Sequence, residues 1–357
     1  MSRITLRNLR NIEAAEIALE PGLNVFCGRN AQGKTSLLEG VGLLARGRSF
    51  RTEDIRQVIQ RGAASMHASG LALDDGRHPL QLEIEVDHDR CRLRVDGRDV
   101  GVARYQGELD VVVYATERLR IVRGGMRERR AFLDRGGAAL WPQYRRLHRD
   151  YERTLAQRNA SLQAGGRGLE AWSERLVETG AQLRWRRGRY VERLQAALAP
   201  QPAPAGERYA VELAPQPLGD VATERAELER QLGACRREER RAQRTLAGPH
   251  RDHVRLLLDG EDAASTASAG QARSLLLALT LASLEVARQE RGSRGLALLD
   301  DLDSELDEER ASGVCRRLAG CGQALVTTAN ERWAGAVAPP GGLFKVDAGQ
   351  VTRSGVS

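Results

Sequence analysis

The stretch LNVFCGRNAQGKTSLLEG (residues 23–40) decides the fold of this chain. Its first five residues are mostly apolar and β-prone, which predicts a buried strand over 23–27. Residues 28–35 then match the pattern G-x-x-x-x-G-K-[ST], and the leucines that follow have helical spacing. A strand, a glycine-rich loop and a helix in this order predict a P-loop, the phosphate-binding turn of an α/β nucleotide-binding fold.

The residue types of this loop fit the chemistry of a nucleoside triphosphate. Gly28 and Gly33 permit a tight turn in which backbone N–H groups converge on the phosphates, and the helix N-terminus adds partial positive charge. Lys34 is expected to reach the β- and γ-phosphates, and the Thr35 hydroxyl is expected to hold Mg²⁺. The predicted nucleotide-binding residues are Gly28, Arg29, Asn30, Ala31, Gln32, Gly33, Lys34, Thr35 and Ser36.

A second stretch, LALLDDLDSELD (296–307), ends an apolar run with acidic residues. A buried parallel strand whose C-terminal end faces a ligand has this pattern, so Asp300 is expected to bind Mg²⁺ as the partner of Thr35. The acids further along predict the first turn of a helix with Ser304 as its N-cap. We favour this interpretation over a catalytic role for the glutamates of that turn.

A third motif, SAGQ (268–271), precedes a long apolar helical stretch and lies between the P-loop and the acidic strand. This order resembles that of ATP-binding-cassette (ABC) ATPases, which carry a signature loop of the type S-x-G-Q. The resemblance implies that three residues bind the γ-phosphate of ATP held by the other subunit of a dimer, namely Ser268, Gly270 and Gln271. It also implies that Asp301 is the catalytic carboxylate that polarises the attacking water, and that SELD (304–307) is the D-loop.

Further motifs extend the resemblance over most of the chain. They are LRNLRN (6–11), GRSFRT (47–52), ERRAFLDR (128–135) and GPHRD (248–252). Together with the three nucleotide motifs, they resemble the RecF family of bacterial recombinational DNA-repair ATPases. That family is of the ABC type and is related to the SMC proteins, but it lacks their long coiled coils.

The resemblance implies a function as well as a fold. It implies an ATP-dependent DNA-binding ATPase of slow turnover, with ATP and Mg²⁺ as cofactors. ATP would hold a homodimer on DNA, and hydrolysis would open it. The family's task implies binding at single-strand/double-strand junctions of gapped DNA and, with RecR and RecO, help in loading the recombinase RecA.

Four positions depart from the family pattern. Ala31 stands where the family usually has glycine, so the loop must accept a β-carbon there. Leu9 and Ile12 replace aromatic residues, which removes a candidate stacking partner for adenine. His253 follows GPHRD where a second aspartate is usual.

The remaining sequence predicts how the fold is divided. Residues 63–100 alternate apolar and polar positions between turn signals, which predicts an antiparallel meander. Residues 116–247 are rich in Arg, Glu, Leu and Ala and predict a helical lobe, a shortened form of the arm of SMC proteins. We therefore predict an ABC-type ATPase lobe in two halves, 1–115 and 248–357, separated by the helical lobe.

The charge of the chain favours a phosphate-bearing partner. The formal net charge is +7, and only Lys34 and Lys345 are lysines, so 53 of the 55 basic residues are arginines. Arginine suits phosphate because its planar fork binds two oxygens at once. Two basic clusters, RWRRGR (184–189) and RREERRAQR (236–244), either contact DNA or form solvated helix faces paired with glutamates.

Several other classes are disfavoured. The five cysteines show no CxxC spacing, so neither a zinc site nor a disulfide framework is indicated. The apolar run at 275–287 is too short to span a bilayer, and the first residues lack the apolar core of a signal peptide, so we expect no membrane partner and a cytoplasmic location. The helical block is too long and basic for a transporter ATPase subunit, and no sustained heptad supports a purely structural SMC-type scaffold.

Overall fold

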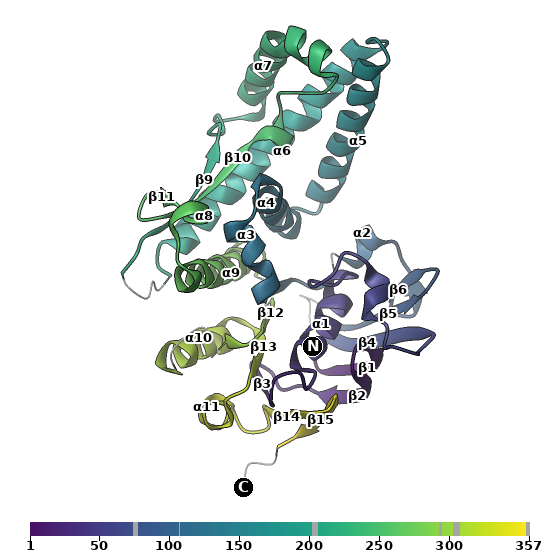
Figure 1. Ribbon diagram of the computed structural model, residues 1–357, viewed down its shortest axis with the longest axis vertical. Helices are drawn as coiled ribbons and strands as arrows, with labels where there is room; N and C mark the ends of the chain where they lie inside the picture. The colour runs from purple at the N-terminus through teal and green to yellow at the C-terminus, as the bar shows by residue number, and fades with distance from the viewer. Residues whose placement is uncertain (74–77, 107, 202–205, 293–294, 303–307, 355–357) are drawn as a thin grey trace. The chain divides into compact units, whose positions relative to one another are not determined.

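The computed structural model describes residues 1–354 except 74–77, 107, 202–205, 293–294 and 303–307 (Figure 1). The chain forms two compact units. Unit 1 comprises Met1–Leu119 and Ala287–Ser357, and unit 2 comprises Arg120–Val286. The two ends of the chain therefore build one unit together, and the middle of the chain builds the other.

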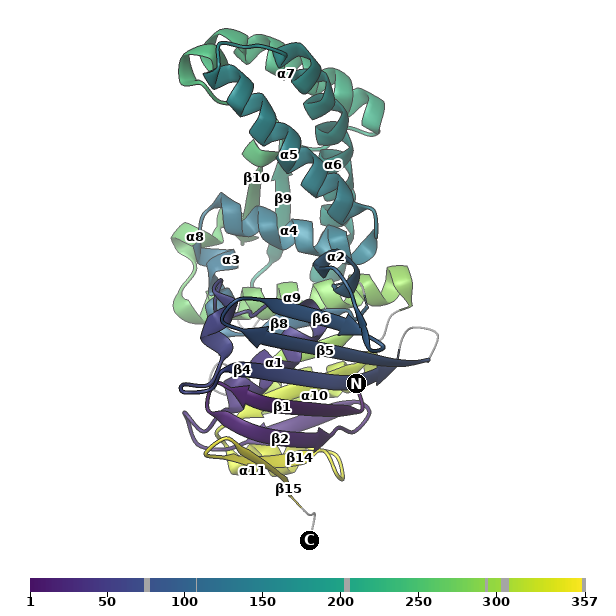
Figure 2. The same cartoon turned by 90° about the vertical axis from the view of Figure 1, so that its right-hand side faces the viewer.

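One sheet of unit 1 is antiparallel and has the order β2-β1-β4-β5-β6-β7 (Figure 2). Its strands are β1 (Arg3–Leu9), β2 (Ile12–Ala18), β4 (Ser65–Leu73), β5 (Pro79–Asp87), β6 (Cys91–Val95) and β7 (Arg98–Asp99). Every second side chain of β4 and β5 is buried, as the alternating sequence predicts. The meander was expected from the sequence, whereas the sequence analysis did not identify β1 and β2.

The second sheet of unit 1 has the order β15-β14-β3-β13-β12-β8, and all its strands are parallel except β15. Its strands are β3 (Leu23–Cys27), β8 (Val111–Tyr114), β12 (Leu296–Leu299), β13 (Gln323–Thr328), β14 (Leu343–Asp347) and β15 (Gln350–Arg353). All five residues of β3 are buried, because β13 and β14 flank it on both edges and helices cover its faces.

Helix α1 (Lys34–Arg46) lies between the two sheets, and α10 (Glu308–Cys321) and α11 (Glu331–Val337) lie on the far face of the parallel sheet (Figure 1). Leu37, Leu38, Val41 and Leu44 of α1 are fully buried among side chains from both sheets. Three short segments complete the unit: η1 (Ile55–Val58), α2 (Val102–Tyr105) and η2 (Thr116–Leu119). The predicted α/β class with an antiparallel meander is confirmed.

Unit 2 is mainly helical, with α6 packed between α5 and α7. Its elements are α3 (Arg120–Arg123), α4 (Met126–Leu140), α5 (Tyr144–Gln163), α6 (Leu169–Leu198), β9 (Tyr209–Ala214), α7 (Val221–Ala242), η3 (Pro249–Arg251), β10 (His253–Leu258), β11 (Glu261–Asp262), α8 (Ala263–Thr266) and the start of α9 (Ala269–Arg291). Tyr144, Tyr151, Leu176 and Leu228 are central to its apolar core. Among the residues described, no helix is both long and apolar enough to cross a membrane.

The second boundary of this unit differs from the sequence prediction. We expected the helical lobe to end at residue 247, whereas the compact unit continues to Val286. The cause is the small sheet β11-β10-β9, in which β10 pairs antiparallel with β9 from His253↔Ala214 to Leu258↔Tyr209. These hydrogen bonds attach the residues after 247 to the helical part rather than to the ATPase lobe.

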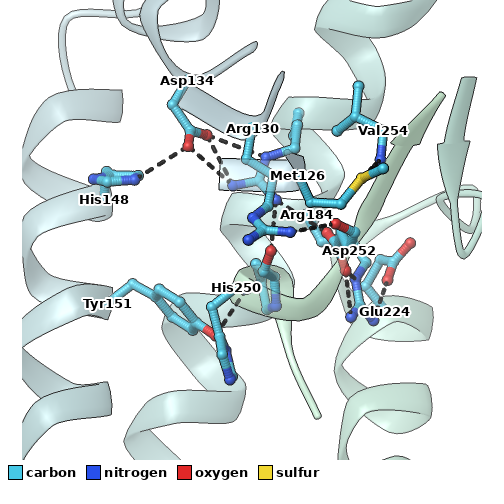
Figure 3. A network of polar contacts seen from close by, with 12 residues as sticks. Met126, Arg130, Asp134, His148, Tyr151, Arg184, Glu224, His250, Asp252 and Val254 are labelled. Carbon is cyan, nitrogen blue, oxygen red and sulfur yellow. Dashed lines mark hydrogen bonds and ion pairs between the residues drawn. The ribbon is translucent and has the colours of Figure 1, made fainter. Parts of the chain in front are cut away.

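Segments of unit 2 meet at a set of buried ionic side chains (Figure 3). Arg187 of α6 bridges two aspartates: Nη1 donates to Oδ2 of Asp252 at 3.1 Å, and Nη2 donates to Oδ1 of Asp134 at 2.9 Å. Arg184 on the same helix donates from Nε and Nη2 to Oδ1 of Asp252, at 3.1 and 2.9 Å. Removing one partner of a buried pair is costly, so these contacts hold α4, α6 and the segment before β10 together.

The carboxyl group of Asp134 strongly favours its ionised form. Burial would raise its pKa, but the charge of Arg187 and the hydrogen bonds from His148 and Tyr144 hold that pKa well below its usual range. His148 lies between two carboxylates, with its Nε2 at 3.2 Å from Asp134 and its Nδ1 at 3.8 Å from Glu152. Burial would lower the pKa of His148, yet these two carboxylates raise it.

The His148→Gln variant is expected to lose more stability at about pH 6 than at about pH 8.5. A histidine whose pKa is raised by folding stabilises the protein fully below its unfolded pKa, about 6.5, and this contribution disappears as the pH rises through the folded pKa. Asp134 stays ionised throughout this window because its own pKa is far lower. His148 is partly exposed, so the effect should be about 1 kcal/mol or less.

Calorimetric unfolding at both pH values measures the difference, with His88→Gln, at an exposed position of unit 1, as the control. An equal loss at both pH values would show that protonated His148 does not stabilise Asp134.

Candidate nucleotide-binding site and signature segment

The P-loop forms the connection between β3 and α1, as the sequence predicts. Lys34 is the first residue of α1, and its ammonium group donates to the carbonyl oxygens of Gly28 at 2.7 Å and Arg29 at 3.1 Å. The lysine side chain thus lies across the loop and is only 5% exposed. Of the predicted loop residues, Gly28, Gly33, Lys34 and Ser36 are buried, Arg29, Asn30 and Ala31 are exposed, and Gln32 and Thr35 are half-buried.

Backbone geometry explains why this loop needs glycine. A β-carbon at Gly28 would lie 2.1 Å from the carbonyl oxygen of Val346, and Gly33 has a φ of 114°, which L-residues rarely adopt. Ala31 also has a positive φ, 64°, so the alanine that departs from the family pattern occupies the left-handed region. This conformation costs about 1 kcal/mol for a residue with a β-carbon.

A turn from the other end of the chain supports the loop. Gln32 accepts two backbone hydrogen bonds from the turn between β14 and β15: its Oε1 from Ala348 N–H at 2.6 Å and its carbonyl oxygen from Gly349 N–H at 2.8 Å. The side chain of Gln32, one of the predicted nucleotide-binding residues, therefore contacts this turn. Sequence reasoning missed this turn, although the residues DAG between two alternating runs at 343–353 carry a hairpin signal.

The predicted metal-binding pair is assembled at the end of β12. Oδ2 of Asp300 accepts a hydrogen bond from the Thr35 hydroxyl at 2.8 Å, although 265 positions separate the two residues. Oδ1 of Asp300 accepts a second bond, at 2.7 Å, from the hydroxyl of Thr327 in β13. Thr327 is fully buried, and the sequence analysis had assigned it only to a strand.

These oxygens fit a magnesium ion. Burial raises the pKa of Asp300 against the two threonine hydrogen bonds, so its charge is poorly compensated. Across the described part of the chain, no cationic side chain pairs with Asp300. One carboxylate and one hydroxyl are the usual protein share of a Mg²⁺ site that phosphate oxygens and water complete.

Asp301, the predicted catalytic carboxylate, has a constrained backbone. Its φ is 50°, and its N–H donates to the hydroxyl oxygen of Thr327 at 2.9 Å. Thr327 therefore fixes both aspartates, since it donates to Asp300 and accepts from Asp301. Left-handed backbone at a non-glycine residue is common at functional sites. The predicted D-loop, 304–307, lies outside the described residues.

The signature residues form the beginning of helix α9 in unit 2. The N–H of Gln271 donates to the Ser268 hydroxyl at 3.2 Å, and the N–H of Ser268 donates to Oε1 of Gln271 at 2.9 Å. This reciprocal pair is a capping box. Ser268 and Gly270 are exposed, and a β-carbon added to Gly270 would point into open space. The positive end of a long helix is thus accessible to an anion.

Two arginines of the same unit hold the segment that leads into the signature. Arg129, in ERRAFLDR, is fully buried and donates from Nη2 and Nη1 to the two carboxylate oxygens of Asp262, at 2.8 and 3.0 Å. Asp262 caps α8 by accepting from the N–H of Ala264 at 2.9 Å. Arg123 donates to the carbonyl oxygen of Ala267 at 3.2 Å, immediately before the signature. Sequence reasoning did not identify this role for either arginine.

A P-loop, a buried strand ending in aspartates and an exposed signature helix together define the fold and motifs of an ABC-type ATPase. The family model described as the RecF/RecN/SMC N terminal domain matches residues 1–352. A protein of Symbiobacterium thermophilum named DNA replication and repair protein RecF is 40% identical over 325 residues, 87% of this chain and 86% of its own length. A Moorella thermoacetica protein of the same name is 35% identical over 336 residues, with coverages of 92% and 89%. The chain belongs to the RecF family.

Solved structures agree with this assignment. A structure of the recombination mediator protein RecF with ATP in the RecFOR pathway has a TM-score of 0.89 and 26% identity, covering 99% of this chain and 97% of the other. The corresponding RecF-ATPrS structure has a TM-score of 0.87 at the same identity and coverage. The Smc head domain of Pyrococcus furiosus, at 13% identity and a TM-score of 0.59, shares the fold and covers 100% of this chain and 96% of its own.

The Asp300→Asn variant is expected to fold with unchanged or slightly higher stability but to lose stabilisation by Mg²⁺. The neutral amide removes a buried charge whose pKa burial raises, and it also removes the charge that would attract the cation. Thermal unfolding with ATP, in the presence of Mg²⁺ or of a chelator, measures the contribution of the metal.

The control for this prediction is Asp89→Asn, at an exposed turn of the meander. If Asp300→Asn keeps the full Mg²⁺-dependent rise in melting temperature, Asp300 is not a metal ligand.

Proposed function

We propose that this chain is an ATP-dependent DNA-binding ATPase of DNA replication and recombinational repair. The observation that carries the proposal is the hydrogen bond from the P-loop residue Thr35 to Asp300, whose carboxylate is linked to the neighbouring Asp301 through Thr327. The names of the relatives support the biological role, because they are called DNA replication and repair proteins, and the solved RecF structures include ATP. A transporter subunit or a passive scaffold would not explain this agreement.

The nucleotide site is proposed to have two halves from two subunits. When bound, ATP with Mg²⁺ supplies the phosphate charge and the electrophilic γ-phosphorus. Lys34 and the loop N–H groups bind the phosphates, Thr35 and Asp300 hold the metal, and Asp301 orients the attacking water. Ser268, Gly270 and Gln271 of a second subunit complete the site through their exposed helix end.

This division would make ATP a switch. A ligand shifts an equilibrium only through its different affinity for two states. ATP contacts Ser268 only when a second copy is present, so binding favours the dimer and hydrolysis favours the monomer. We propose that the dimer holds gapped DNA at single-strand/double-strand junctions and acts with RecR and RecO to help load RecA. The description of the solved relatives as recombination mediators in the RecFOR pathway supports these partners.

ATP is expected to double the molar mass of the wild-type protein in solution, whereas Ser268→Arg stays monomeric. The arginine would place a bulky side chain at the helix end that must approach the γ-phosphate, but it leaves the P-loop unchanged. Light scattering with and without ATP measures the mass, and a binding assay on the monomer confirms that Ser268→Arg still binds ATP. Lys34→Met, which weakens nucleotide binding itself, is the second control. If wild type and Ser268→Arg respond alike, the site has no second half.

Loss of the Arg129–Asp262 pair is expected to weaken ATP-dependent dimerisation about tenfold or more while leaving the affinity of the monomer for ATP unchanged. The pair fixes the segment before Ser268 in unit 2, and the P-loop lies in unit 1. Asp262→Asn tests this. The double variant with Arg129→Gln also removes the arginine charge that the single change would leave buried without its partner.

The matched control is Glu212→Gln, which breaks an exposed ion pair with Arg255 in the same unit. Two quantities are measured for each variant: the dimerisation constant in the presence of ATP, and the separate effects of the variant on kcat and on KM for ATP. An unchanged dimerisation constant in a folded variant would show that this pair does not position the signature segment.

A further inference from the structure

The two basic clusters found in the sequence have different environments. In the first, at 184–189, Arg184 and Arg187 are at most 3% exposed and are neutralised by buried aspartates. Arg189 in the same cluster pairs with Glu192 at 2.6 Å. Most of the positive charge of this cluster is therefore used inside unit 2 or balanced on its surface.

The second cluster, at the C-terminal end of α7, has five arginines, of which Arg236 pairs with Glu170 at 3.2 Å and the other four are of another kind. Arg237, Arg240 and Arg241 are exposed and, at helical spacings of three and four residues, share one face of the helix. Arg244, also exposed, follows the helix end, and its N–H donates to the carbonyl oxygen of Glu239 at 3.3 Å. We call these four residues the α7 arginine cluster. Within the described residues, none of their guanidinium groups has a hydrogen-bond or ion-pair partner.

The acidic residues interspersed in this cluster do not neutralise it. Glu239 points inward and is 1% exposed, and its carboxylate accepts from Arg158 of α5 at 3.1 and 2.6 Å. It also accepts from the N–H of Leu246 at 2.8 Å, so both oxygens are occupied. Glu238 is the one acid of the segment on the exposed side, and in the part of the chain that the structure describes it forms no ion pair. The surface therefore keeps an excess of positive charge.

The earlier part of the same helix shows the opposite arrangement. Arg225 pairs with Glu229 at 3.0 Å, and Arg230 pairs with Glu227 at 2.6 Å. These two arginines are 50% and 69% exposed, so exposure alone does not leave an arginine unpaired on α7. The unpaired charge is confined to the C-terminal end.

The helix dipole accounts for part of this pattern. Cations near a helix C-terminus are favourable by about 0.3–1 kcal/mol each, and Arg240 and Arg241 lie in the last turn. Like charges at these spacings, however, repel one another by a few tenths of a kcal/mol per pair. Four neighbouring guanidinium groups that form no ion pair among the described residues therefore gain little for the fold, and they suit a polyanionic partner.

We propose that the α7 arginine cluster binds the phosphate backbone of duplex DNA. From Arg237 to Arg241 the helix rises about 6 Å, a length over which duplex DNA carries three to four negative charges, about one per 1.7 Å. A guanidinium fork can bind two phosphate oxygens at once, and contacts to phosphate carry no information about base sequence. The cluster therefore contributes affinity without sequence preference. This inference rests on the proposed DNA-binding function and locates one contact surface for it.

The test is the salt dependence of duplex binding by the full chain with ATP and Mg²⁺, followed by fluorescence anisotropy. The variant replaces Arg237, Arg240, Arg241 and Arg244 by Gln. If all four contact phosphates, the slope of log K against log salt becomes shallower by about 3 to 4, since each contact contributes about 0.9. The same four positions changed to Lys keep the slope, because phosphate neutralisation requires charge rather than a fork.

The matched control is the double variant Arg225→Gln and Arg230→Gln, which removes exposed but paired arginines from the same helix and is expected to leave the slope within about one unit. ATP-dependent molar mass and thermal unfolding establish that each variant is folded and associates normally. The fourfold Gln variant could be prevented from folding by its combined changes, and two double variants then replace it: Arg237→Gln with Arg240→Gln, and Arg241→Gln with Arg244→Gln. Each double variant is expected to show about half of the change in slope, because it removes two of the four contacts.

The outcomes separate this inference from the function on which it rests. If wild type binds no DNA, the proposed function fails. If wild type binds duplex DNA and the fourfold Gln variant has the slope of the control, the α7 arginine cluster is not a contact surface, although the function stands. A slope change for single-stranded but not duplex DNA would likewise overturn the assignment to duplex.

Discussion

The nucleotide site depends on a constraint on β3. A buried parallel strand must fill both of its hydrogen-bonding edges, and β3 fills them with β13 and β14, which come from the last part of the chain. The P-loop begins where β3 ends, so the same pairing brings Thr35 beside Asp300 and brings the β14–β15 turn against Gln32. The loop sequence alone therefore cannot form the site, because its metal-binding partner and its support arrive only when the two ends of the chain pair in one sheet.

In unit 2, buried ion pairs join segments that are far apart in the sequence. Its buried arginines are each matched to carboxylates from other segments: Arg187 to Asp134 and Asp252, Arg129 to Asp262. Ion pairs at this depth repay their desolvation only with complete hydrogen bonding. Breaking one partner of such a pair leaves a buried charge without compensation, which is strongly destabilising. The motifs ERRAFLDR and GPHRD thus have a structural explanation that is independent of nucleotide: they supply the charges that fix α4, α6 and the approach to α9.

Local patterns in the sequence predicted the parts of the molecule that local physics determines. The strand, glycine loop and helix over 23–40, the acid-terminated strand at 296–299 and the meander all follow from periodicity and turn chemistry. The missed features depend on residues that lie far apart in the chain. Arg187 finds its aspartates 53 and 65 positions away, and no pattern within 184–189 distinguishes it from a surface arginine. For the same reason no local pattern near residue 247 shows that the compact unit continues to Val286, since only the β9–β10 ladder shows which unit the following residues join.

The role of each basic residue in this arginine-rich chain therefore depends on its position in the structure. Lys34 occupies a position where a compact ammonium reaches two carbonyl oxygens inside a closed loop, which the planar, wider guanidinium would not fit as well. Buried arginines pair with carboxylates and backbone carbonyl oxygens and hold segments of the fold together. Paired surface arginines are nearly neutral in energy. The unpaired arginines at the end of α7 belong to neither group: they repel one another in the free protein, and this repulsion is relieved when phosphates of the opposite charge approach. The electrostatic energy of such a surface is weakly unfavourable in the free protein and favourable in a complex with a polyanion. Binding of this kind weakens as the salt concentration rises.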